Sequence, residues 1–288
     1  MTDGNGAVLT ARGVWRSFRE GATTLEVLTG DGKLIRRISN HRPSNGFEQP
    51  EEWTDREKPA DVIPDAAGAN RFAWDLRRED PERIPGAFYS DDGPRGPLVT
   101  PGHYQVRLTV GGKSQTAPLE VVPDPRLQGQ ITDREIADLE DLSMQTWSDI
   151  DALHKAVNQI RETRARLGIV NKWSKDNAEA KPVIDAANEL AAKLAPIEGR
   201  LLQVKMAASE DNLRYPNMLN EQYDTFSGTL DTEDFGPTES QRQVYAYLHG
   251  ELTGVLAKWR SVSDTDLPAF QALMRAHGVP AIGDIRRP

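Results

Sequence analysis

The sequence contains no cysteine, and this absence removes several kinds of protein chemistry. Without thiols the chain cannot be a disulfide scaffold, hold zinc through thiolates or use a cysteine nucleophile. Positive charge is also in deficit, because 35 Lys and Arg residues stand against 44 Asp and Glu residues, a formal net charge of -9. This balance argues against binding to nucleic acid or anionic lipid in general, since both need a cationic surface.

Long apolar runs are missing as well. No run approaches the roughly 20 apolar residues that cross a bilayer, so we expect no membrane span. The opening residues 1–6 lack the basic-then-apolar pattern of a signal peptide. With 288 residues, the chain has the length for one large or two ordinary domains, each with its own core.

Up to about residue 125, prolines and glycines are frequent and apolar residues alternate, which is the period of β-strands. The pattern predicts strands over residues 23–29, 33–39, 71–76, 103–110 and 114–122. Pro118 lies in the last of these and indicates an edge position or the start of a strand. Short strands separated by turn signals predict an immunoglobulin- or fibronectin-III-like β-sandwich over 23–125, after an N-terminal segment 1–22. Two long loops, 40–67 and 77–100, interrupt this sandwich.

From residue 126 to residue 288, apolar residues recur every three or four positions, as in helices. Thr132 and Glu135 form a capping-box pattern at the start of a predicted helix that runs to about residue 167, with Gly168 as its C-cap. Further helices are predicted over residues 181–206, around 218–226, from about 237 to 259 and over 267–277. We expect them to pack as an antiparallel helical bundle, separated from the sandwich by the Pro-Asp-Pro sequence at 123–125. Residues 1–127 carry a net charge of -2 and the remainder carries -7.

Histidines and carboxylates do not form a recognisable catalytic pattern. None of the five histidines shows the pairing with glutamate that a zinc-protease helix needs, and no Gly-x-Ser-x-Gly sequence occurs. His154 and His249 lie on predicted helices and could meet across the bundle, although a histidine on a helix flank is the simpler interpretation. Asp75, Asp80, Asp91 and Asp92 could contribute to a glycosidase pair, but each is explained by a strand end, a turn or a loop tip. We therefore predict a protein that is not an enzyme, with no cofactor and no metal.

The loops offer residues for an interaction site. Trp53, Phe88 and Tyr89 lie on predicted loops, where an aromatic ring can stack on a sugar or anchor a protein interface. Asp91 and Asp92 lie in the same loop as Phe88 and Tyr89, and would take part with the aromatic residues in a carbohydrate-binding or sugar-processing site. These five residues are the candidate interaction site.

Four segments together resemble a known bacterial module: residues 68–76 (GANRFAWDL), 96–108 (GPLVTPGHYQVRL), 211–219 (DNLRYPNML) and 266–273 (DLPAFQAL). They are similar to the region that follows the β-propeller in bacterial sortilin-like, BNR-repeat "glycosyl hydrolase-like" proteins. The propeller itself is absent from this sequence, so no catalytic residue of that family has a counterpart here. The resemblance implies a periplasmic or extracellular location.

These observations lead to two hypotheses about function. The first is a non-catalytic scaffold or docking subunit of a larger, extracytoplasmic protein assembly. The second is a carbohydrate-binding or sugar-processing accessory module. A protein partner is expected under the first hypothesis and a glycan under the second.

Overall fold

The structure is a computed structural model that describes residues 7–9, 23–41, 62–64, 70–89, 93–174 and 177–279. It divides into two compact units, and neither is continuous in sequence. The first unit contains residues 1–81, 94–147 and 228–238, and the second contains residues 82–93, 148–227 and 239–288. Helix α1 (Asp133–Ser174) therefore begins in the first unit and continues into the second.

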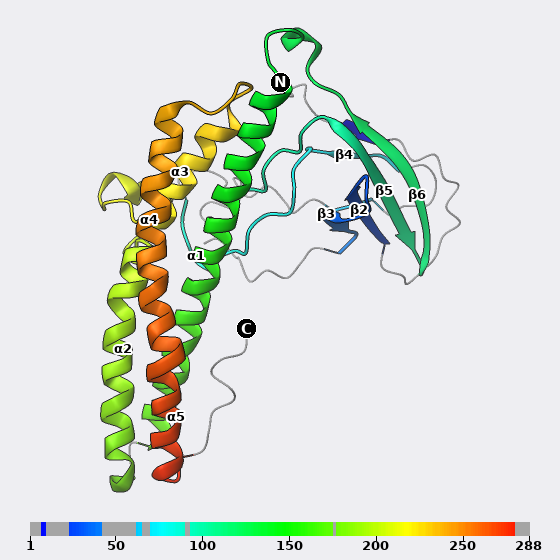
Figure 1. Cartoon of the computed structure of the whole chain (residues 1–288). Coiled ribbons are helices and arrows are strands. Elements are labelled where there is room, and N and C mark those ends of the chain that lie inside the picture. The colour runs from blue at the N-terminus through cyan, green and yellow to red at the C-terminus, as the bar shows by residue number, and fades with distance from the viewer. Residues whose placement is uncertain are drawn as a thin grey trace. The chain divides into compact units, whose positions relative to one another are not determined.

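The first unit contains a four-stranded antiparallel sheet (Figure 1). Its strand order is β3-β2-β5-β6, so that two hairpins lie side by side. Gly32 in the first hairpin and Gly112 in the second adopt positive φ angles of 87° and 78°, which glycine tolerates best. A separate two-stranded sheet pairs β1 with β4. The strands are β1 (Ala7–Leu9), β2 (Thr23–Thr29), β3 (Leu34–Ser39), β4 (Phe72–Trp74), β5 (Gly102–Val110) and β6 (Lys113–Val121).

One face of the four-stranded sheet carries the core of the first unit. Side chains from all four strands meet there: Leu25, Val27, Ile35, Ile38, Tyr104 and Val121. Ile63, Trp74 and Val99 are buried in the same cluster and come from outside the sheet. The Trp74 indole donates to the carbonyl of Arg77 at 2.9 Å, which satisfies its polar atom within this core.

The prediction of an immunoglobulin-like sandwich followed by a helical bundle is wrong. Among the described residues the strands form one small four-stranded antiparallel sheet and a separate two-stranded pair, together with long helices, and not the two facing antiparallel sheets of a sandwich. Four of the five predicted strands pair within a single sheet, β4 is only three residues long and pairs with β1, and the loop predicted over 77–100 supplies no further strand in its described residues. This part of the chain contributes single apolar side chains, such as Val99, to the core.

The individual strands were more predictable than their assembly. Each of the five predicted strands has a counterpart in β2 to β6, within three residues at either end. Pro118 lies in the interior of β6, one of the two edge strands of the sheet, so the first of its two predicted positions is confirmed. A proline is tolerated there because an outward N–H on an edge strand needs no partner.

The other face of the sheet carries a row of charges. Glu26 on β2 lies opposite Arg37 on β3 and opposite Arg107 on β5. One Glu26 oxygen accepts from Arg37 Nε at 2.9 Å and Nη2 at 2.6 Å, and the other accepts from Arg107 Nε at 2.5 Å. The hydrogen bond from Arg107 is the main cause that lowers the pKa of Glu26, with a smaller contribution from Arg37, while burial opposes both.

Replacing Glu26 by glutamine is expected to lower the free energy of unfolding by about 1–2 kcal/mol at pH 7, because charge-assisted hydrogen bonds are lost. The loss is modest because the Arg37 and Arg107 side chains are 59% and 39% exposed and reach water. Since the pKa of Glu26 is lowered in the folded state, its contribution is present above the ordinary carboxyl pKa. It disappears as the pH falls through the folded pKa. Urea unfolding at pH 7 and at about pH 3 should therefore show a difference from the wild type that shrinks in acid; an unchanged difference would contradict this explanation.

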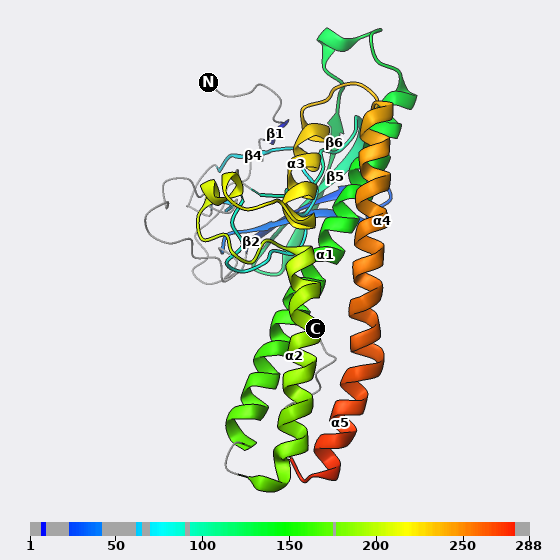
Figure 2. The same ribbon diagram turned by 90° about the vertical axis from the view of Figure 1, so that its left-hand side faces the viewer.

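The second unit is helical (Figures 1 and 2). Helices α1, α2 (Lys181–Leu201) and α4 (Glu239–Ser261) alternate in direction, and α4 continues through residues 262–266 into the last helix. Arg161 on α1 binds Glu198 on α2, while Asn171 further along α1 binds Asn188 earlier on α2. Trp259 on α4 donates to Gln159 on α1 at 3.2 Å. The helices after α1 are α2 (Lys181–Leu201), α3 (Leu219–Asp231), α4 (Glu239–Ser261) and α5 (Leu267–Ala276).

Helix boundaries follow the sequence signals at some positions only. The capping box at the start of α1 is confirmed, because the Glu135 amide donates to Thr132 Oγ1 at 3.2 Å and the Thr132 amide donates to Glu135 at 2.9 Å. The predicted end near Gly168 is wrong, since α1 continues to Ser174 and buries Val170. Packing of Val170 outweighs the cost of about 1 kcal/mol for a glycine inside a helix.

Candidate functional site

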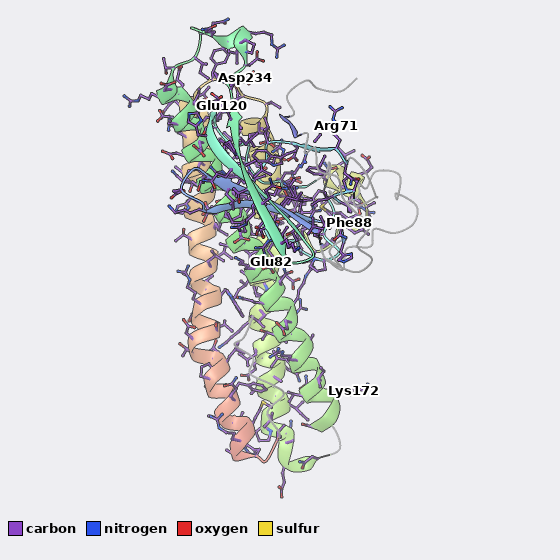
Figure 3. All side chains as sticks on the ribbon, turned by 90° about the vertical axis from the view of Figure 1, so that its right-hand side faces the viewer. Arg71, Glu82, Phe88, Glu120, Lys172 and Asp234 are labelled. Carbon is purple, nitrogen blue, oxygen red and sulfur yellow. The ribbon has the colours of Figure 1, made fainter. Side chains whose placement is uncertain are left out.

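Two of the five predicted interaction residues, Phe88 and Tyr89, lie in the described part of the chain, whereas Trp53, Asp91 and Asp92 lie outside the described residues. The segment that carries Phe88 is bound to α1 (Figure 3, where Glu82 and Phe88 are labelled). The Glu82 amide donates to Asp151 at 3.0 Å, and Asn158 donates to the Glu82 carboxylate at 2.6 Å. Phe88 itself is half-buried.

Tyr89 makes contacts within the second unit. Its hydroxyl lies 3.4 Å from Asn220 Oδ1 on α3 and 3.4 Å from His154 Nε2 on α1. Gly93 lies against the ring, because a Cβ atom at this glycine would be only 2.9 Å from Tyr89 Cδ2. Burial raises the pKa of Tyr89, and the charge of Asp224 adds to the shift. The structure therefore shows Tyr89 as an internal contact between its own segment, α1 and α3.

His154 is the centre of this contact and is only 2% exposed. Its Nε2 lies 2.8 Å from Asn220 Oδ1, and its Nδ1 contacts the carbonyl oxygen of Glu82. Burial lowers the pKa of His154, and the hydrogen bonds with Glu82 and Asn220 oppose this shift. A neutral imidazole has a single N–H for these two acceptors, and the Tyr89 hydroxyl is positioned to donate to Nε2 or to Asn220.

A second polar contact joins α3 to α1 one helical turn away. The Tyr223 hydroxyl donates to Asp149 Oδ2 at 2.8 Å, and His249 Nδ1 on α4 lies 2.8 Å from the same oxygen. Burial, reinforced by the charge of Asp149, raises the pKa of Tyr223. The two histidines thus have different partners, Asn220 for His154 and Asp149 for His249, and the structure does not bring them together as a pair.

The same network reaches the connection between α2 and α3, residues 202–218, which we call the α2–α3 segment. Glu221 is 6% exposed and accepts from Asn220 Nδ2 at 3.1 Å. It also accepts from the amides at both ends of the segment, Gln203 at 3.3 Å and Met218 at 2.8 Å. The Gln203 side chain crosses the base of the segment and donates to the carbonyl of Pro216 at 2.9 Å. One buried carboxylate therefore fixes both ends of this connection.

Further hydrogen bonds order the middle of the α2–α3 segment. Asp211 accepts from the amides of Ala207 at 2.8 Å and Ala208 at 3.2 Å, at the start of a short 3-10 helix (Ser209–Leu213). Despite this order, Leu213 is 84% exposed and Val204 is 53% exposed.

Basic side chains lie beside these apolar ones. The Tyr215 ring centroid lies 5.3 Å from Arg214 Cζ and 5.9 Å from Lys205 Nζ, which is within the range of cation–π attraction. The contact between Lys205 and Tyr215 brings the beginning and the end of the α2–α3 segment close together. We call Val204, Lys205, Leu213, Arg214 and Tyr215 the projecting patch.

The projecting patch was not predicted from the sequence. The Tyr-Pro pair at 215–216 indicated a break between helices and nothing more. The available signal was Leu213 itself, an apolar residue within a polar stretch that belongs to no helical or strand period.

Within the described ranges, no group of three or more His, Asp or Glu side chains is arranged to hold a metal ion. No described helix is long and apolar enough to cross a membrane. Comparison with known proteins found no match to a family model, to a curated protein or to a solved structure.

Proposed function

We propose that this chain is a non-catalytic interaction module that docks or stabilises a larger protein assembly through the projecting patch. The exposure of Leu213, 84% on a segment that is ordered by hydrogen bonds, is the observation that carries this proposal. Apolar and aromatic side chains on a fixed surface are typical anchors of protein interfaces.

The order of the α2–α3 segment favours binding. Glu221, Gln203 and Asp211 hold it in place in the absence of a partner, so that binding costs less conformational entropy than it would for a flexible loop. Covering one leucine side chain contributes about 1.5–3 kcal/mol. A single such anchor, surrounded by polar contacts, is enough to influence affinity strongly.

The carbohydrate-binding hypothesis receives less support from the described residues. Tyr89, one of its aromatic residues, has its ring against Gly93 and its hydroxyl near Asn220. A periplasmic or extracellular assembly is the setting that the resemblance to sortilin-like proteins implies, and we include that location in the proposal.

Replacing Leu213 by aspartate is expected to abolish the recovery of a stoichiometric protein partner when the tagged full chain is used to purify complexes from its source. The substitution places a charge where the interface needs an apolar side chain, and a fully exposed position tolerates it without loss of stability. Val122→Asp is the matched control, because Val122 is 66% exposed and lies in the other compact unit.

The proposal predicts a partner with the wild type and with Val122→Asp, and none with Leu213→Asp. Equal recovery with all three proteins would show that the projecting patch is not the docking surface. A glycan array probed with the wild type provides the opposing test, since specific glycan binding would favour the carbohydrate hypothesis instead.

A further inference from the structure

We infer that the projecting patch recognises an acidic protein surface with an apolar recess that accepts Leu213. The inference rests on the proposed function and adds the chemistry of the partner. Three observations lead to it: the charge on the patch, the internal pairing of several arginines elsewhere in the same unit, and the net charge of the helical region.

The positive charge of the patch is available to a partner. Lys205 and Arg214 are exposed, and within the described residues neither forms an ion pair with a carboxylate. Three arginines elsewhere in the second unit are paired internally. Arg161 and Arg164 share the buried Glu198, and Arg200 binds Glu251 at 2.5 Å. The two patch cations instead lie within cation–π distance of the Tyr215 ring.

The arrangement fits a common form of protein interface, an apolar centre with a charged rim. Leu213 supplies the most exposed apolar side chain among the described residues, and Lys205 and Arg214 supply charge of one sign beside it. A complementary surface therefore has a recess for a leucine side chain and carboxylates around that recess. Complementary charge also accelerates encounter, so we expect binding to depend on ionic strength.

An acidic protein is favoured over an anionic membrane as the partner. The region from residue 128 onwards carries a net charge of -7, which an anionic lipid surface would repel over its whole extent. Two exposed aliphatic side chains and one half-buried tyrosine also provide little apolar area for insertion into lipid. A protein surface can match the small cationic patch while avoiding the acidic remainder.

The experiment uses the immobilised full chain and a library of random displayed peptides as the probe. We expect selection to enrich peptides that combine a large apolar residue with several Asp or Glu residues. Their binding should weaken by roughly tenfold or more in Leu213→Asp and in the double variant Lys205→Glu/Arg214→Glu. The double variant Lys172→Glu/Lys258→Glu is the charge-matched control, because both lysines are exposed on helices away from the segment, and it should bind within about twofold of the wild type.

Salt provides an independent readout. Raising the ionic strength from about 0.01 M to about 0.15 M shortens the Debye length from about 30 Å to about 8 Å, which should weaken the acidic peptides several-fold. Vesicles containing phosphatidylserine serve as the membrane probe, and patch-dependent binding to them would overturn the inference in favour of lipid.

The inference is also overturned if no peptide is enriched, if the enriched peptides lack acidic residues, or if binding is unchanged in both patch variants. These outcomes can be separated from failure of the proposed function. A partner that depends on Leu213 but is insensitive to salt and to Lys205→Glu/Arg214→Glu would preserve the interaction module and reject only the acidic surface.

Discussion

Replacing Gly96 by alanine is expected to destabilise the protein by about 3 kcal/mol, because the added methyl group has no space. A Cβ atom at Gly96 would lie 2.0 Å from the carbonyl oxygen of Arg78 and 2.5 Å from its carbonyl carbon. These are backbone atoms, so no side-chain rotation can relieve the clash. The free energy of unfolding in urea, followed by circular dichroism, measures the effect.

The backbone around Gly96 cannot shift without breaking other contacts. The Gly96 amide donates to Asp80 at 2.9 Å, and its carbonyl accepts from the Arg77 guanidinium at 3.0 Å. The carbonyl oxygen of the next residue, Pro97, accepts from the Arg78 amide at 2.9 Å. These contacts therefore hold residues 77–80 against residues 96–97, two stretches of the first unit that lie outside its strands.

Gly254→Ala is the control for the Gly96 substitution. Gly254 lies inside α4 and a Cβ atom there would meet nothing within 4 Å. An alanine in a helix interior should raise stability by about 0.5–1 kcal/mol. If the two alanine variants changed stability in the same direction, the steric explanation for Gly96 would be wrong.

Replacing His154 by alanine is expected to lower the free energy of unfolding by about 2–4 kcal/mol at pH 7.5. The substitution leaves a cavity and removes a partner from Asn220 and from the Glu82 carbonyl, both of which face the buried imidazole. His249→Ala should lower the free energy of unfolding by less, about 1 kcal/mol or below. The His249 side chain is 51% exposed, and its partner Asp149 still accepts a hydrogen bond from the Tyr223 hydroxyl in the variant.

The effect of His154 should depend on pH. Burial lowers its pKa in the folded state, so the unfolded chain takes up the proton first as the pH falls below the ordinary histidine pKa of about 6.5. The stabilisation that His154 contributes is therefore fully present above that pH and declines below it. The negative charges of Asp151 and Glu82 raise the pKa of His154 and so make this decline smaller. The difference between the wild type and His154→Ala should therefore be smaller at about pH 5.5 than at about pH 7.5. Identical pH profiles of stability for the two proteins would contradict a neutral, buried His154.

Local signals in the sequence predicted local structure well. The alternation around Tyr104 and the glycine pair at 111–112 predicted the hairpin of β5 and β6, because both are properties of neighbouring residues. The Thr132–Glu135 capping box succeeded for the same reason. The sandwich prediction failed because four of the five predicted strands pair in one sheet, and which strands share a sheet depends on long-range packing rather than on periodicity.

The candidate site was less predictable than the fold. Tyr89 was identified as an aromatic residue on a loop, but its contacts with His154 and Asn220 join residues 65 and 131 positions away. No spacing rule connects such distant residues. Leu213 was overlooked because exposure of an apolar side chain is a property of the folded surface and not of the sequence pattern.

The division of α1 between the two compact units has a consequence for how this region can change over evolution. The chain crosses from one unit to the other repeatedly, at α1 and again around residues 228–238. A recombination event anywhere between residues 82 and 238 would therefore leave at least one unit without some of its residues. We expect the two units to be inherited, duplicated or lost together as one cassette, and truncated copies to accumulate as insoluble protein.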